Sequence, residues 1–312
     1  DAPFQRLELD DLRRLIVLYE QVAADLADVQ ELGGESELHA YLGALVARAH
    51  AEIHALREPA VRWRPFRWFT ADVPAAVRRH GRAAALAVAI FLGGAAFGAA
   101  ALLADPAART HLLPFEHLRM PPTERVELEE RAMAGRAEHD RNYQTFAAVL
   151  WVNNVRVSLL LLALGMTFGV GTALVVAVNG MLLGAVAVDF VVAGQTPFLL
   201  GWLLPHGAVE IPAILLAAQA GLTLGGSLAG FDAGVRRPLA ERLSAIRADL
   251  LSLIGGAAVL LVWAAAVESF LSQQHEPRLP YGIKIALGTL ELIAITFWLT
   301  RGARARTEEE AA

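Results

Sequence analysis

The chain has 312 residues, of which 55% are hydrophobic and 19% charged, and it contains no cysteine. This composition is too apolar for one or two soluble domains, so the excess of apolar side chains is expected to face lipid. The absence of cysteine excludes structural disulfides, thiolate metal sites and cysteine nucleophiles. A net charge of −5 without a basic stripe argues against nucleic acid as a partner.

The first 60 residues carry the pattern of two amphipathic helices. Apolar residues recur every three or four positions over 9–32 and again over 38–56, with Gly33-Gly34 between the two runs and Pro59 after the second. Two such helices joined by a short loop predict an antiparallel hairpin at 1–60, which we assign to the cytoplasm.

Residues 61–82 mix tryptophan and phenylalanine with arginine immediately before the first long apolar run. This composition is typical of the cytoplasmic headgroup zone and predicts an interfacial connector. A nucleic-acid patch is the competing interpretation, and the apolar run that follows argues against it.

Apolar runs long enough to cross a membrane follow within residues 83–300. They cover 83–104, two spans within 147–193, 198–224, 250–271 and 283–299, with a polar segment at 105–146. The turn between the second and third spans is expected at residues 165–171, and Asn179-Gly180 is the alternative. The sequence therefore predicts an all-α protein, a polytopic membrane bundle of about six helices with a small N-terminal hairpin.

The arginine distribution predicts the orientation of this bundle. Arginines cluster before the first span, at 236–247 and at 301–306, and the positive-inside rule assigns such clusters to the cytoplasm. Segment 105–146, which also carries six arginines, then lies outside. Both termini, including the tail at 301–312, are expected on the cytoplasmic side of the cytoplasmic (inner) membrane.

Ionisable side chains at membrane depth are costly, so each is a candidate functional residue. These are Arg156, Asp189, His206, Glu210, Glu268 and Glu291. Asp189 and Glu268 fall near the outer ends of their spans, where a solvated carboxylate is the simpler interpretation. Glu291 is expected to face a partner inside the bundle or to be protonated.

The fourth span holds two of these residues, His206 and Glu210, four positions apart on one helical face. Prolines and a glycine predict a kinked or unwound helix beside the pair, a pattern found where irregular backbone lines a cavity. These helix-breaking residues are Pro205, Gly207 and Pro212. At 1.5 Å per residue, Arg156 reaches about the depth of the pair. Three amides complete the predicted cluster: Asn153, Asn154 and Asn179.

Four interpretations compete for this cluster. In the first, Arg156 neutralises Glu210 and the group fixes helix packing. In the second, His206 and Glu210 relay protons or ions; in the third, the cluster binds a lipid headgroup or small solute. The fourth, metal-dependent hydrolysis, lacks ligands, because one histidine and one carboxylate are too few. No phosphate-binding glycine loop or Gly-x-Ser-x-Gly elbow is present, so we expect no enzyme, no cofactor and no metal.

Four motifs in this order resemble the stage II sporulation protein M family. They are residues 146–157 (FAAVLWVNNVRV), 163–172 (ALGMTFGVGT), 179–184 (NGMLLG) and Leu204-Pro-His-Gly-x-x-Glu210. The resemblance covers roughly residues 75–300, and the hairpin with its connector is similar to longer members from bacteria that do not sporulate. By resemblance, the family site comprises Asn153, Asn154, Asn179, Gly180, Pro205, His206, Gly207 and Glu210.

In spore formers, this resemblance implies an inner-membrane scaffold that recruits two peptidoglycan-degrading partners, stage II sporulation proteins D and P. For members that do not sporulate it implies no established activity, so the engulfment role is not transferred to this chain.

We therefore expect a non-enzymatic membrane scaffold or assembly factor. The alternative is a transporter or channel-like protein that uses His206 and Glu210 as a relay. Glycine-rich helix faces predict a homo-oligomer, with a dimer favoured; these glycines are Gly93, Gly94, Gly98, Gly255 and Gly256. Membrane lipids and cell-envelope proteins are the other expected partners.

Overall fold

The computed structural model describes residues 9–31, 36–57, 64–113, 119–134, 140–230, 238–272 and 274–301. Every regular element in these ranges is a helix, which confirms the predicted all-α fold for the described residues. The chain divides into two compact units, Asp1–Arg64 and Pro65–Ala312, and each is described by itself. Apart from Arg301, the predicted tail at 301–312 lies outside the described residues, as do parts of segment 105–146.

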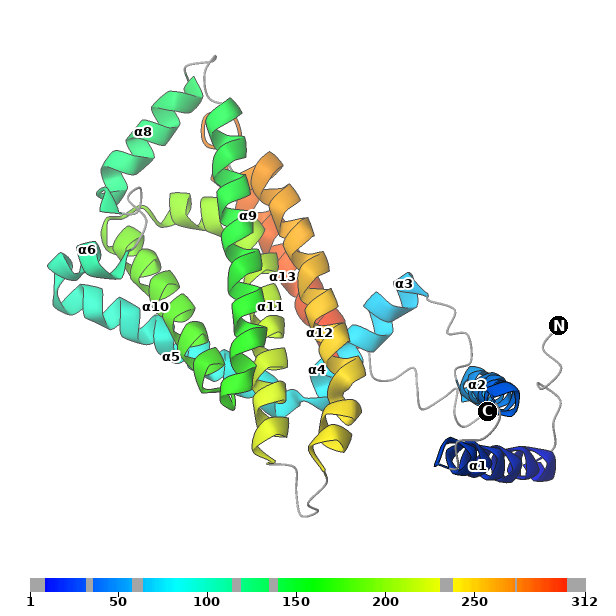
Figure 1. Ribbon diagram of the computed structural model, residues 1–312. Helices are drawn as coiled ribbons and strands as arrows, with labels where there is room; N and C mark the ends of the chain where they lie inside the picture. The colour runs from blue at the N-terminus through cyan, green and yellow to red at the C-terminus, as the bar shows by residue number, and fades with distance from the viewer. Residues whose placement is uncertain are drawn as a thin grey trace. The chain divides into compact units, whose positions relative to one another are not determined.

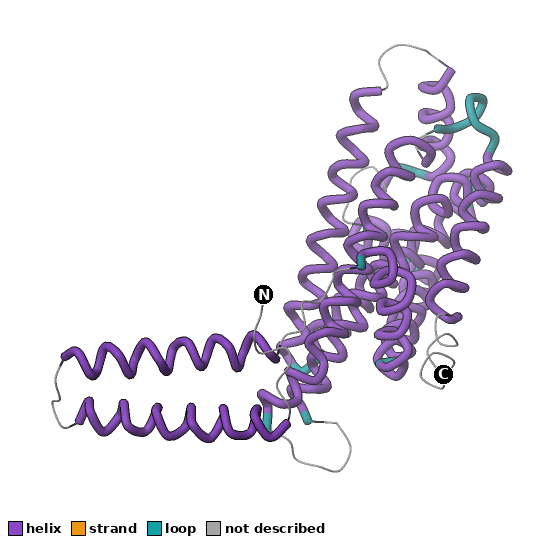
Figure 2. Tube along the Cα trace, turned by 90° about the vertical axis from the view of Figure 1, so that its right-hand side faces the viewer, coloured by secondary structure: helices purple, strands orange, loops and turns teal. Residues whose placement is uncertain are grey.

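The N-terminal unit is a helical hairpin. Helices α1 (Leu9–Glu31) and α2 (Ser36–Arg57) run side by side, as Figure 2 shows. The hydroxyl of Tyr19 lies 3.2 Å from Nδ1 of His50 across the pair. The helices form because apolar residues repeat at helical spacing, yet Val17, Leu18 and Tyr41 stay half-exposed or more.

The second unit is an antiparallel bundle of six long helices (Figure 1). They are α5 (Gly81–Ala104), α9 (Asp140–Ala163), α10 (Val170–Val192), α11 (Thr196–Ala229), α12 (Leu239–Val267) and α13 (Tyr281–Arg301). In the described residues, five helices are long and apolar enough to cross a membrane, and the sixth, α9, has a shorter apolar stretch, Trp151–Thr167. The chain is therefore a multi-pass membrane protein.

The turn between α9 and α10 lies at the first of the two positions considered from the sequence. A short 3-10 segment, η4 (Leu164–Thr167), is followed by Phe168 and Gly169, whose φ angles are 57° and 84°. Both angles are left-handed, which reverses the chain at once. Asn179 and Gly180 lie inside the unbroken α10.

Helices α5 and α10 cross at backbone contact through small residues on both sides. A Cβ atom at Gly98 would fall on the carbonyl oxygen of Met181, and one at Gly184 would fall on that of Ala95. Gly94 and Gly180 meet the opposite backbone in the same way. This is the small-xxx-small packing typical of membrane helices, here made within one chain. Gly94 and Gly98 are therefore not free for self-association.

The connector is a broken helix that packs on α12 and α13. It consists of α3 (Pro65–Arg67), the π-helical η2 (Trp68–Asp72) and α4 (Val73–Arg79). The ring of Trp298 stacks on Phe69, with centroids 4.4 Å apart. Gly255 faces the Trp68 ring and Gly256 faces Val73, so these glycines, too, are used inside the chain. Of the five glycines behind the expected self-association, Gly93 alone has nothing within 4 Å of its Cβ position, and the homo-oligomer stays a prediction.

Helix α11 is the centre of the bundle. It contacts α5, α9, α10, α12 and α13, and most of its side chains are buried. The helix is continuous across Pro205 and Pro212, so the expected unwinding is not found. Its first turns nevertheless run across the bundle at an angle to the remainder (Figure 1), which is the kink that interior prolines produce.

Candidate functional site

The bend of α11 is packed directly against α13. A Cβ atom at Gly288 would lie 2.7 Å from the carbonyl carbon of Leu204 and 2.8 Å from the nitrogen of Pro205. Only glycine on α13 allows this approach. The bend therefore fixes the direction of the residues that follow Pro205, above all His206.

His206 points into the bundle and pairs with the end of α12. Its Nδ1 atom lies 2.6 Å from Oε2 of Glu268 and 3.0 Å from Oγ of Ser272. Both partners belong to η5 (Glu268–Ser272), a π-helical turn. All three residues are at most 2% exposed. A π-turn rotates the side chains that follow it relative to a regular helix, and here the same turn presents two polar groups to one imidazole.

Glu268 therefore differs from its sequence interpretation as a solvated carboxylate. It does lie at the end of its span, but it is 2% exposed and paired with His206. Asp189 is corrected in the same way: it is 7% exposed and forms an ion pair with Arg109 of α6 (Arg109–Leu112). A carboxylate withdrawn from water is stable only with such partners.

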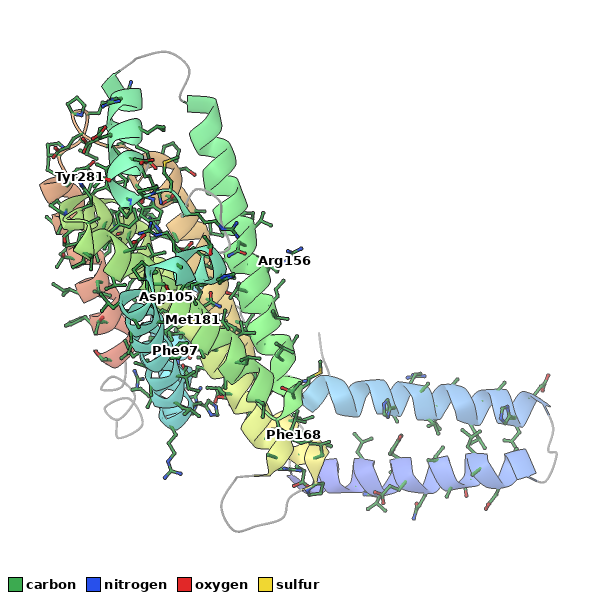
Figure 3. All side chains as sticks on the ribbon, turned by 90° about the vertical axis from the view of Figure 1, so that its left-hand side faces the viewer. Phe97, Asp105, Arg156, Phe168, Met181 and Tyr281 are labelled. Carbon is green, nitrogen blue, oxygen red and sulfur yellow. The ribbon has the colours of Figure 1, made fainter. Side chains whose placement is uncertain are left out.

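Glu210 is held by α9, but not by the residue expected. Its Oε1 atom accepts a hydrogen bond from the side-chain amide of Asn154. Arg156 lies on the exposed face of α9 and points away from the bundle (Figure 3). Two positions along a helix correspond to about 200° of rotation, so Asn154 and Arg156 cannot both face α11. The expected Arg156–Glu210 pair is not formed.

The remaining residues of the predicted polar cluster do not take part in the contact between Asn154 and Glu210. Asn179 donates to the carbonyl of Val175 in its own helix, and Asn153 is half-buried beside Asn154. Gly207 is buried, and a Cβ atom there would meet side chains of its own helix at ordinary contact distance. Glu291 faces a partner, since the indole nitrogen of Trp263 donates to its Oε1 at 3.0 Å.

Lys284 is a polar core residue that the sequence analysis did not single out. It is fully buried, and its Nζ atom donates to the carbonyls of Ser272 and Gln274 at 2.7 and 2.6 Å. The ammonium group thereby satisfies carbonyls left free at the end of the continuous helical segment formed by α12 and η5, called the α12 segment below. The signal was present, because Lys284 is the only lysine in the chain and lies inside an apolar run.

A cap formed by α8 covers this end of the bundle. Helix α8 (Pro122–Ala134) places Arg125 over the ring of Trp202, with the guanidinium carbon 4.3 Å from the centroid. Nε of Arg125 donates to Glu129 at 2.9 Å, and the other carboxylate oxygen of Glu129 lies 2.9 Å from Nε2 of His275. Burial alone would raise the pKa of Glu129, but His275 and Arg125 lower this pKa to about 2.

A second contact holds the cap in place. The hydroxyl of Tyr281, at the start of α13, donates to Glu130 of α8 at 2.8 Å. Figure 3 shows Tyr281 at the same end of the bundle as α8. The cap and the core cluster therefore share the end at which η5 and α13 meet.

Taken together, the polar groups join helices pairwise. His206 joins α11 to η5, Glu210 joins α11 to α9, and Lys284 joins α13 to the end of the α12 segment. In the described part of the chain, no three His, Asp or Glu side chains come together as metal ligands. The arrangement offers ion pairs and hydrogen bonds between helices, all within the bundle and its cap.

Comparison with known families agrees with the motifs. Residues 2–55 match a model described as a domain of unknown function (DUF8413). Neither a curated protein nor a solved structure matches the chain. Residues 87–273, more than half of the chain, match the model of Stage II sporulation protein M. This range contains His206, Glu210, Asn154 and Glu268, so the chain belongs to the stage II sporulation protein M family.

Proposed function

We propose that this protein is a non-enzymatic scaffold of the cytoplasmic membrane, whose buried polar cluster fixes the bundle so that its two polar ends can hold partners. One observation carries the proposal: each main polar group of the core bonds to a different helix. The pairs His206–Glu268 and Asn154–Glu210 are both of this kind. Such pairs specify which helices meet, because an unpaired polar group in the membrane is costly.

The course of α11 beyond Glu210 supports a structural role over transport. The next two turns bury Ala213, Ile214 and Ala217, which cannot carry protons. A relay needs titratable groups or water along its whole path. On this proposal, the cluster ends in an apolar core.

The surfaces available to partners are the hairpin and the cap. The hairpin exposes Leu18 and Tyr41, and α8 exposes Leu128. With the basic connector before α5 assigned to the cytoplasm, the hairpin faces the cytoplasm and α8 faces the outside. Partners would then be a cytoplasmic protein at the hairpin and a cell-envelope protein at the cap.

The test combines a flux assay with cross-linking in cells. Purified protein in liposomes, under an imposed pH gradient, should leak protons no faster than empty liposomes. A photoreactive residue at Leu128 or Tyr41 should cross-link to a discrete protein, whereas the matched control at Leu290, which is exposed on a membrane-spanning helix, should not. Proton flux that disappears in His206→Gln would overturn the scaffold proposal.

A second candidate function is a proton or ion relay. It is favoured by a row of titratable groups at the end of the bundle that α8 covers. Glu129 and His275 of the cap, then Glu268 and His206 of the core, extend titratable groups inward toward Glu210. The same flux assay decides between the two functions. A relay requires flux in the wild type and its loss in Glu210→Gln, while a scaffold requires neither.

A further inference from the structure

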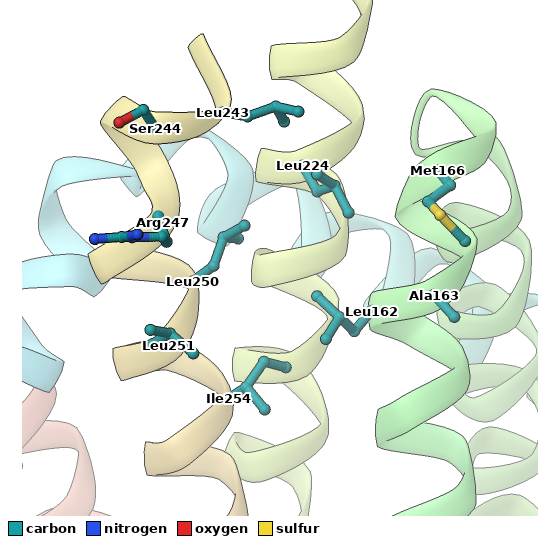
Figure 4. A pocket seen from close by; sticks show the side chains of 10 residues that line it. All are labelled: Leu162, Ala163, Met166, Leu224, Leu243, Ser244, Arg247, Leu250, Leu251 and Ile254. Atoms are coloured by element: carbon teal, nitrogen blue, oxygen red, sulfur yellow. The ribbon is translucent and has the colours of Figure 1, made fainter. Parts of the chain in front are cut away.

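A groove runs along the bundle between α9 and α12. Near the turn from α9 to α10 it opens into a pocket of about 590 Å³ between α9, α11 and α12. Farther along, a second pocket of about 230 Å³ lies between α9 and α12. Ile254 lines both pockets, so the two form one continuous depression. Figure 4 shows the first pocket, with side chains from all three helices.

The lining of the groove is apolar except for Ser158 in the second pocket and two residues at one end. Leu162, Leu224 and Leu251 line the first pocket, and Trp151 and Val262 line the second. The polar exceptions at the mouth of the first pocket are Ser244 and Arg247. From Arg247 to Val262, fifteen positions of α12 span about 22 Å at 1.5 Å per residue. Half of a hydrocarbon core is about 15 Å, so the groove extends from a headgroup zone through one leaflet.

Arg247 is available to a ligand. Its side chain is exposed and has no ion-pair partner among the residues that the structure describes. Two charged residues near it on α12 are engaged elsewhere: Arg242 donates to the carbonyl of Ser227 at 2.7 Å, and Asp249 pairs with Arg79 and His80. A guanidinium without an ion-pair partner in the described part of the chain therefore lies at the open end of the groove, with its fork able to bind a phosphate.

We propose that this groove binds an anionic phospholipid, with one acyl chain between α9 and α12 and the headgroup phosphate at Arg247. The inference rests on the chain being a membrane protein and is independent of the scaffold role. A helix of a second copy, 10–12 Å across and of this length, would need about 2,000 Å³, far more than the groove offers. An extended peptide would leave its backbone groups without partners against these apolar walls.

Native mass spectrometry on protein released from vesicles tests the proposal. The vesicles contain dioleoyl phosphatidylglycerol and dioleoyl phosphatidylcholine in equal parts. The wild type should retain phosphatidylglycerol selectively. Arg247→Ala should reduce that retention about fivefold relative to phosphatidylcholine, the effect of one arginine near an anionic surface. Arg82→Ala, an exposed arginine at the start of α5, is the matched control and should leave the ratio unchanged.

A second pair of variants tests the groove itself. Ala163→Trp fills the first pocket and should displace the lipid whatever its headgroup, because the indole occupies the space of the acyl chain. Ala266→Trp, exposed on α12 outside the two pockets, should retain lipid like the wild type. Equal retention of both lipids by the wild type, or a lipid count unchanged in Ala163→Trp, would overturn the proposal. Thermal melting of each variant in the same vesicles shows whether it has folded. If Ala163→Trp has not folded, Ala258→Trp, which fills the second pocket, takes its place.

Discussion

Nδ1 of His206 lies 2.6 Å from Oε2 of Glu268, although the two residues are 62 positions apart in the chain. The contact ties the bend of α11 to the π-helical end of the α12 segment. Both residues are at most 2% exposed. Each group therefore replaces part of the hydration that the other has lost on burial.

Removing one member of this pair should destabilise the bundle strongly. Glu268→Ala removes the carboxylate paired with a buried imidazole and should cost about 3 kcal/mol or more in the free energy of unfolding. The double variant with His206→Ala should lose less than the sum of the two single variants. Unfolding in mixed detergent micelles measures all three. Additive losses would show that the two residues do not act as a pair.

Asn154, and not Arg156, should couple to Glu210. Asn154→Leu removes the hydrogen bond to a largely buried carboxylate and should cost about 2 kcal/mol. Arg156→Leu, on the exposed face two positions away, should change stability by about 0.5 kcal/mol at most. Unfolding of both variants under the same conditions checks this. A larger loss of stability in Arg156→Leu than in Asn154→Leu would favour the Arg156–Glu210 ion pair expected from the sequence.

Arg125 should hold the cap closed. Arg125→Ala loses both the contact with Trp202 and the hydrogen bond to Glu129, about 2 kcal/mol together. Because Lys284 is the only lysine and is buried, its labelling by an amine-reactive ester measures opening. The rate should rise about 30-fold. Arg131→Ala, whose pair with Glu127 is exposed, should leave the rate unchanged, and an equal increase there would contradict the role of Arg125.

Acid should release the cap through Glu129. The folded-state pKa of about 2 lies below the usual value of 4.5, so the carboxylate contributes stability that is complete above about pH 5. This contribution is lost as the pH falls toward 2 and amounts to about 3 kcal/mol. The amine-reactive ester labels Lys284 too slowly in acid, so the release of the cap is measured by hydrogen exchange of the α8 backbone amides. Glu129→Gln should flatten this pH dependence. Glu124→Gln, at an exposed position of α8, is the control and should keep the pH dependence of the wild type. The same pH dependence in Glu129→Gln would show that Glu129 does not control the release of the cap.

The α5–α10 crossing should tolerate no side chain larger than hydrogen. Gly98→Ala places a methyl group on the Met181 carbonyl and should cost about 3 kcal/mol, because backbone must move. Gly93→Ala has nothing within 4 Å and should be neutral or slightly stabilising. The folded yield and unfolding midpoint of the two variants provide the comparison. Equal behaviour would mean that the helices do not approach this closely.

Much of the fold follows from local patterns along the chain. Uncharged runs of about 20 residues are long enough to cross a bilayer, and five of the predicted spans correspond to helices of sufficient length and apolarity. The hairpin helices and the turn near Gly169 likewise follow from apolar spacing and glycine position. These features depend on neighbours in the sequence, so a single sequence contains them.

The partners of the polar groups required the tertiary structure. Counting residues gives the depth of a side chain in a span but not its rotation about the helix axis, and a shift of two positions turns it to the opposite face. Depth alone could not distinguish Asn154 from Arg156 as the partner of Glu210. The positions of Glu268 and Lys284 depend on a π-turn and on where α12 ends. The sequence by itself thus determined the spans and most of the polar residues at membrane depth, and packing between distant helices decided which of these residues meet.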